Sequence, residues 1–146
     1  MAANLYYRKD IADELNLDFS QVKSIEDLTP IYEKVAESHP EMSALTGGGG
    51  GLELIHTLKD FEVDYLTDSW AKPMGAVLMG DSMTVTNLYA TDEFRGRVEL
   101  MRDWYEKGYV MKDSSTTTAS AQETVAAGKA FSFIGNQAGN YGVQEV

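Results

Sequence analysis

Three neighbouring side chains in this sequence have the chemistry to hold a polar ligand: Tyr65, Asp68 and Trp70. An aromatic face stacks on the apolar face of a pyranose ring, and a carboxylate accepts hydrogen bonds from paired hydroxyls. This combination favours a sugar-binding site. The alternative is structural, with Trp70 filling the core and Asp68 capping a turn.

A second candidate pair, Asn136 and Gln137, follows residues 129–135, a short apolar run that contains aromatics and is bounded by glycine. Such a run predicts a buried strand. Ligands of open α/β sheets usually lie at the carboxyl ends of the strands, and amides offer hydroxyls both donors and acceptors. We therefore expect both amides at a ligand site; the alternative is a turn that ends the strand.

Other kinds of site have little support in the sequence. The hydroxyl run 114–118 is more typical of a cap and loop than of an anion site. Glycines 47–51 are not followed by Gly-Lys-Ser/Thr, so a flexible linker or loop is favoured over a phosphate loop. His39 and His56 are the only histidines, and cysteine is absent. We expect both histidines at the surface, no metal site and no cofactor. No nucleophile motif occurs, which argues against an enzyme.

Helices and strands that position these groups are predicted from caps and periodicity. In the second half, Thr91 caps a helix whose apolar stripe is Phe94, Val98, Met101 and Tyr105, and Lys107-Gly108 ends it. Thr118 is the expected cap of a second helix over 119–127, which Gly128 ends. The buried strand 129–135 follows.

The first half is expected to alternate in the same way. A strand over 5–7 precedes a helix over 9–15 that ends near Asn16. Ser24 with Asp27 forms a variant capping box for a helix that stops before Pro40, and Pro30 bends this helix or moves its start to residues 29–30. Further expected elements are a strand over 42–45, a weak helix signal within 52–70, and a hairpin of strands 75–79 and 84–89 around a turn at 80–82. This order predicts an α/β domain with helices packed on a small mixed sheet.

Two blocks resemble one protein family. Residues 104–136 follow the pattern "W-Y-x-x-G-Y-V, K-D, a Thr string, helix, G-K-A-F-x-F-x-G-N", and residues 5–12 and 22–28 read LYYRKDIA and VKSIEDL. Both blocks resemble the second lobe of bacterial extracellular solute-binding proteins of family 1 type, the receptors of carbohydrate ABC importers. The resemblance implies a single lobe of a type II periplasmic-binding-protein-like fold over residues 1–146.

Composition limits the possible classes of function independently of that resemblance. The chain has 146 residues, 43% of them hydrophobic, which suits one domain with a real core. A formal net charge of -11 disfavours nucleic acid as a partner. The sequence shows no apolar run long enough for a membrane span, no signal peptide and no lipobox cysteine, so we expect a lobe or fragment of a longer receptor.

The resemblance implies a non-catalytic function, namely binding of a solute, expected to be a sugar or oligosaccharide. The implied partners are the second lobe of the receptor and a membrane ABC permease. The implied location of the full-length lipoprotein is extracellular, anchored at the cell surface. The alternative is a structural or interaction module whose main partner is another protein domain.

Overall fold

The computed structural model of this chain describes residues 4–47, 63–65, 75–78, 84–114 and 116–135. Its main sheet has the strand order β1-β6-β2, formed by β1 (Asn4–Tyr7), β6 (Ala130–Gly135) and β2 (Ser43–Thr46). β6 pairs antiparallel with β1 and parallel with β2. The sheet is therefore mixed, and its central strand is the buried, apolar run that precedes Asn136.

The segment after α4 extends this sheet beyond β2. Leu45 forms a parallel bridge with Val110. Its N–H donates to the carbonyl of Tyr109 at 2.9 Å, and its carbonyl accepts from the N–H of Met111 at 3.0 Å. Both backbone groups of Leu45 are therefore paired on this side of β2.

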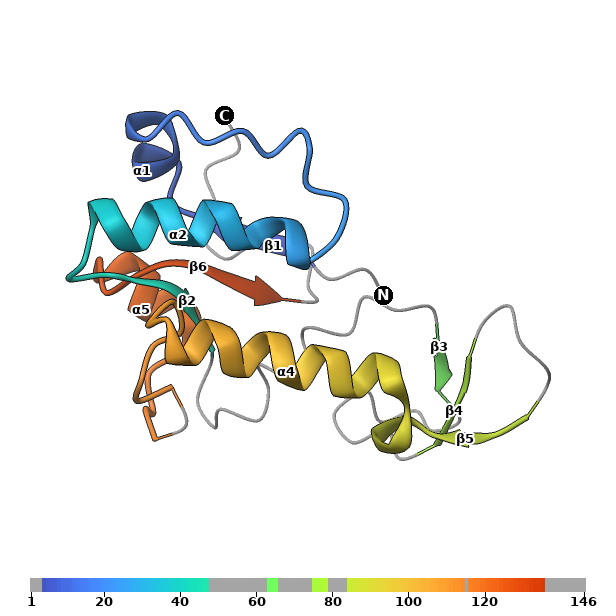
Figure 1. Cartoon of the computed structure of the whole chain (residues 1–146). Helices are drawn as coiled ribbons and strands as arrows, with labels where there is room; N and C mark the ends of the chain where they lie inside the picture. Colours follow the sequence, from blue (N-terminus) through green and yellow to red (C-terminus); the bar gives the residue numbers. More distant parts are fainter. Residues whose placement is uncertain (1–3, 48–62, 66–74, 79–83, 115, 136–146) are drawn as a thin grey trace.

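The helices are α1 (Lys9–Glu14), α2 (Thr29–Ser38), α4 (Asp92–Glu106) and α5 (Ala121–Ala126), with short 3-10 turns η1 (Glu26–Leu28) and η2 (Leu88–Ala90). In the view of Figure 1, α2 and α4 lie on either side of β6. Among the described residues, no helix is long and apolar enough to cross a membrane. Helices packed on a small mixed sheet confirm the predicted α/β class.

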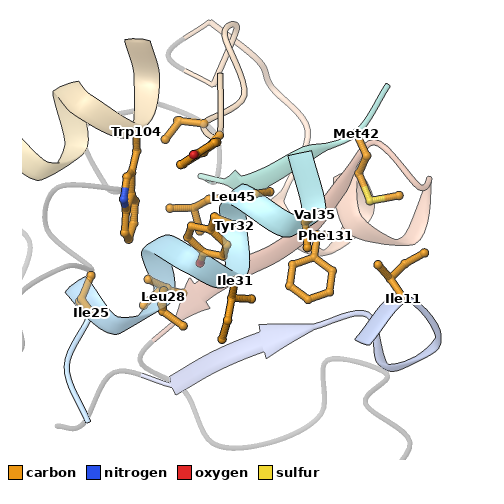
Figure 2. Packing of buried hydrophobic residues seen from close by; sticks show 14 of the residues in the cluster. Ile11, Ile25, Leu28, Ile31, Tyr32, Val35, Met42, Leu45, Trp104 and Phe131 are labelled. Carbon is orange, nitrogen blue, oxygen red and sulfur yellow. The ribbon is translucent and has the colours of Figure 1, made fainter. Parts of the chain in front are cut away.

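The core lies between α2, α4 and the main sheet, as Figure 2 shows. Tyr32 and Trp104 are both fully buried, and their rings meet edge to face with centroids 4.9 Å apart. The same buried hydrophobic cluster contains Leu28, Ile31, Val35, Leu45 and Phe131. An aromatic pair of this geometry contributes beyond its buried area, so Tyr32 and Trp104 fix how the two helices pack.

A buried polar chain joins α2 to the sheet. Ser132 Oγ lies 2.7 Å from the carbonyl of Ala44 and 3.1 Å from the hydroxyl of Tyr32. Because the serine has one proton, which it donates to Ala44, the tyrosine hydroxyl donates to Ser132 Oγ. Burial raises the pKa of Tyr32 above its usual range.

The local signals in the first half are confirmed, with small shifts. β1 and α1 form where expected, and Asn16 has a positive φ of 49° after α1. The carboxylate of Asp27 accepts a hydrogen bond from the N–H of Ser24 at 2.9 Å. However, this motif opens η1, and α2 starts at Thr29 with Pro30 in its first turn. This is the shifted start that Pro30 indicated.

The predicted buried stripe of α4 is partly wrong. The Thr91 cap is confirmed, since its Oγ1 accepts from the N–H of Phe94 at 3.2 Å, and Gly108 follows the helix with a φ of 79°. Val98 and Tyr105, however, are 39% and 48% exposed. The buried face instead carries Arg97, Met101 and Trp104, because Trp104 packs on Tyr32 and the Arg97 guanidinium pairs with Glu26 at 2.9 Å.

The predicted cap of α5 is also wrong. Ser120, not Thr118, caps this helix, and its Oγ accepts from the N–H of Glu123 at 3.2 Å. The Glu123 carboxylate accepts from the N–H of Ser120 at 2.9 Å in return. A capping box satisfies two terminal donors at once, and Thr118 has no partner with which to form one. Gly128, with a φ of 74°, follows the helix as predicted.

A second, antiparallel sheet has the order β3-β4-β5, from β3 (Val63–Tyr65), β4 (Gly75–Leu78) and β5 (Thr86–Asn87). Pairing of β4 with β5 confirms the predicted hairpin. Its turn at 80–82 lies outside the described residues. The helix signal within 52–70 rests on Leu54, Ile55, Leu58 and Phe61, which lie outside the described residues; of that range only 63–65 are described, and they form β3. Of the glycine run only Gly47 is described.

Candidate ligand-binding site

The carboxyl ends of β2 and β6 meet at one edge of the main sheet. The two strands are parallel, with Thr46 opposite Phe133. β1 starts at the same edge because its antiparallel register places Asn4 opposite Gly135. Asn136 follows Gly135 directly in the chain. This edge, which we call the strand-end edge, consists of Asn4, Thr46 and Gly135.

Backbone and side-chain contacts hold this edge in place. Thr46 is fully buried, and its Oγ1 lies 3.2 Å from the carbonyl of Gly47 and 3.3 Å from Met111 Sδ. Met111 belongs to the segment that extends the sheet beyond β2. Asn4, by contrast, is exposed. The strand-end edge therefore offers an accessible amide beside a fixed backbone, as binding of a polar ligand requires.

Aromatic rings lie next to the strand-end edge. Tyr6 and Phe133 are opposite one another on β1 and β6, and their rings stack with centroids 4.8 Å apart and planes 8° apart. A Cβ at Gly135 would lie 3.5 Å from a carbon of each ring, so this glycine sits directly against the pair.

Sequence reasoning missed Asn4 and Tyr6 as members of this region. The signal that places them there is the register of β1 against β6, and strand register between distant segments is set by tertiary packing rather than by local spacing. The aromatic Tyr6 was visible only as part of a short strand.

The predicted site residues themselves stay predictions. Tyr65 is the last residue of β3, where its backbone is opposite Ala76. Asp68, Trp70, Asn136 and Gln137 lie outside the described residues. The strand that precedes Asn136 in the sequence, β6, ends at the strand-end edge.

The hydroxyl run and the histidines, the other candidate sites in the sequence, have structural contacts where the structure describes them. The N–H groups of Thr116 and Thr117 both donate to the carbonyl of Asp113, which is the loop predicted for this hydroxyl run. His39 is only partly exposed: 17% of its side chain is accessible, and it lies 3.4 Å from carboxylate oxygens of Glu14 and Glu41, whereas His56 lies outside the described residues. Within the described ranges, no group of three potential metal ligands occurs.

Comparison with known proteins finds similarity in sequence to a carbohydrate transport protein. No family model matches the chain. A carbohydrate ABC transporter substrate-binding protein of Streptococcus pneumoniae serotype 4 is 26% identical over 117 residues, which are 80% of this chain and 22% of that protein.

Solved structures agree with the sequence match. The N-glycan transport solute-binding protein NgtS of Streptococcus pneumoniae superposes with a TM-score of 0.70 at 22% identity, over 92% of this chain and 28% of that one. Its complex with Man5GlcNAc gives a TM-score of 0.68 at 21% identity, with the same coverage. The alginate-binding protein AlgQ2 without calcium gives 0.68 at 18% identity, over 91% of this chain and 26% of that one.

The chain thus spans less than a third of the length of each of these proteins. Its α/β fold is similar to that of one part of these solute-binding proteins, as the sequence predicted. The resemblance to carbohydrate solute-binding proteins is therefore confirmed, in sequence by the pneumococcal relative and in fold by NgtS and AlgQ2.

Proposed function

We propose that this chain is a ligand-binding lobe of an extracellular solute-binding protein that serves an ABC importer, and that its ligand is an oligosaccharide. The observation that carries this proposal is the match of 92% of the chain to NgtS, a protein whose structures include complexes with Man5GlcNAc and Man1GlcNAc.

The strand-end edge supports the same proposal. It presents the exposed amide of Asn4 next to the partly exposed Tyr6, whose ring stacks on the buried Phe133, and the predicted amides Asn136 and Gln137 follow Gly135 in the sequence. Amide groups satisfy sugar hydroxyls, and aromatic faces cover the apolar side of a pyranose. In the proposed site, a second group of side chains supplies the same stacking and hydrogen bonding: Trp70, Asp68 and Tyr65.

The proposed mechanism is binding without bond making or breaking, so the chain is not an enzyme. In the complete receptor a second lobe closes over the ligand about a hinge, and a membrane ABC permease reads the closed state. The receptor acts outside the membrane, anchored at the cell surface. Half of such a cleft binds more weakly than the whole, because it makes only part of the contacts.

Tryptophan fluorescence tests the proposal. The chain has two tryptophans, Trp70 and Trp104, and Trp104 is fully buried against Tyr32. A mannose-containing oligosaccharide at millimolar concentration should change the emission of the parent chain. The variant Trp70→Phe, which retains the buried Trp104, should show no change. A flat response of the parent to every glycan of a broad panel contradicts the proposal.

A further inference from the structure

Helix α4 carries an apolar surface that the lobe does not bury. Tyr89 packs edge to face on Phe94, with centroids 4.9 Å apart. Tyr89, Val98 and Tyr105 are 40%, 39% and 48% exposed, and Phe94 is partly exposed. We call these four residues the α4 shoulder. It contains most of the stripe that helical spacing predicted for the core.

Three of the four shoulder residues lie in one strip along α4. With roughly 100° of rotation per residue, Phe94, Val98 and Tyr105 fall within an arc of about 40°. They extend over about 16 Å of helix at 1.5 Å per residue. These three side chains therefore lie on one side of α4.

Charges border this strip in a pattern that suits a second copy of the same helix. Arg95, near the start of α4, has no ion-pair partner in the part of the chain that the structure describes. Glu106, at the end of α4, makes only an exposed pair with Arg102 at 2.7 Å. Arg95 and Glu106 lie on the same side of the strip, within about 20° of one another around the helix axis.

We propose that two copies of this chain associate through the α4 shoulder, with the two α4 helices antiparallel and related by a two-fold axis. In an antiparallel pair centred between Leu100 and Met101, Arg95 of one copy lies beside Glu106 of the partner subunit. The two-fold axis repeats this pair, as isologous interfaces require. The shoulders meet between the two ion pairs, which removes Val98 and Tyr105 from water.

The net charge of -11 on each copy opposes this association. Added salt screens long-range repulsion between the copies, and it also strengthens effective burial of apolar surface when the salt is strongly hydrated. Dimer formation should therefore increase when sodium sulfate is added, although the two ion pairs themselves weaken.

Sedimentation equilibrium of the whole chain over a broad concentration range tests the proposal. The parent should show a monomer–dimer equilibrium, and Val98→Glu should weaken it about tenfold or more. Arg95→Glu and Glu106→Arg should each weaken it, whereas the double variant Arg95→Glu/Glu106→Arg should restore it, because the swapped charges again face each other. Circular dichroism checks that each variant is folded.

Glu37→Arg, a charge reversal on an exposed residue of α2, is the matched control and should leave the dimer at least as strong as in the parent. A chain that stays monomeric at millimolar concentration in sulfate overturns the proposal. So does a dimer that Val98→Glu leaves unchanged, or one that the double charge swap does not restore.

Discussion

The indole nitrogen of Trp104 donates a hydrogen bond to Thr29 Oγ1 at 3.0 Å, which ties α4 to the first turn of α2. The same indole packs edge to face on Tyr32. Since Tyr32 in turn bonds Ser132 in the central strand, these contacts link two helices and the sheet through side chains that are mostly buried.

Replacing Trp104 should therefore destabilise the whole lobe. We expect Trp104→Ala to lower the free energy of unfolding by about 3–5 kcal/mol, the usual cost of removing a buried large aromatic. Thr29→Val, which removes only the hydrogen bond, should cost about 1 kcal/mol. Urea unfolding measures both. Equal losses for the two variants would contradict the packing role given to Trp104.

Stability should depend on Tyr32 at alkaline pH. Burial raises the pKa of Tyr32 in the folded lobe, so its stabilising effect is complete below the ordinary tyrosine pKa of about 10. As the pH rises above that value, the unfolded chain loses this proton first and stability falls.

Urea unfolding between pH 8 and 11 measures this dependence. Tyr32→Phe should be less stable by about 1 kcal/mol at pH 8 and should lose less stability than the parent at higher pH. Tyr105→Phe, at an exposed position, is the control. If the Tyr32→Phe and parent curves run parallel up to pH 11, the buried hydroxyl does not carry the effect.

The helix cap of α5 gives a direct test of which residue starts the helix. Ser120→Ala removes the side-chain acceptor of the capping box and should cost about 1 kcal/mol. Thr118→Ala should be nearly neutral. Thermal unfolding followed by circular dichroism distinguishes the two variants, and a larger loss for Thr118→Ala would reinstate it as the cap.

Hydrogen bonds from Ser120 also lower the pKa of Glu123. A carboxyl group whose pKa is lowered in the folded state stabilises it above the ordinary glutamate pKa, and this effect is lost as the pH falls. The difference in stability between the parent and Glu123→Gln should therefore shrink as the pH is lowered from 6 to 3. A difference that stays constant over this range would contradict the hydrogen bonds from Ser120 to the Glu123 carboxylate.

Local signals in the sequence predicted most of the main sheet and its helices. Thr91, Gly108 and Gly128 act through their own backbone and nearest neighbours, so their roles are readable from a few residues. Val98 and Tyr105 were misplaced because helical spacing defines an apolar face but not how far it is rotated from the core. The contact between Trp104 and Tyr32, 72 positions away along the chain, sets that rotation.

The candidate site was predictable only in part. The strand before Asn136 followed from a short apolar run. Asn4 was not predicted, because its place at the site follows from the antiparallel register of β1 against β6. That register depends on pairing between opposite ends of the chain. Trp70 and Asp68 rest on side-chain chemistry alone and stay predictions.

A titration of the isotope-labelled chain with a mannose-containing oligosaccharide, followed by amide NMR shifts, shows most directly whether this chain binds glycan, because it detects millimolar binding and locates it. We expect saturable shifts at Asn4, Gly135, Asn136 and Gln137 and at Trp70, with α4 unaffected, and weaker binding by Asn136→Ala. Shifts that are absent at the highest glycan concentration, or that are confined to residues other than the strand-end edge and the predicted site residues, would contradict the proposed function.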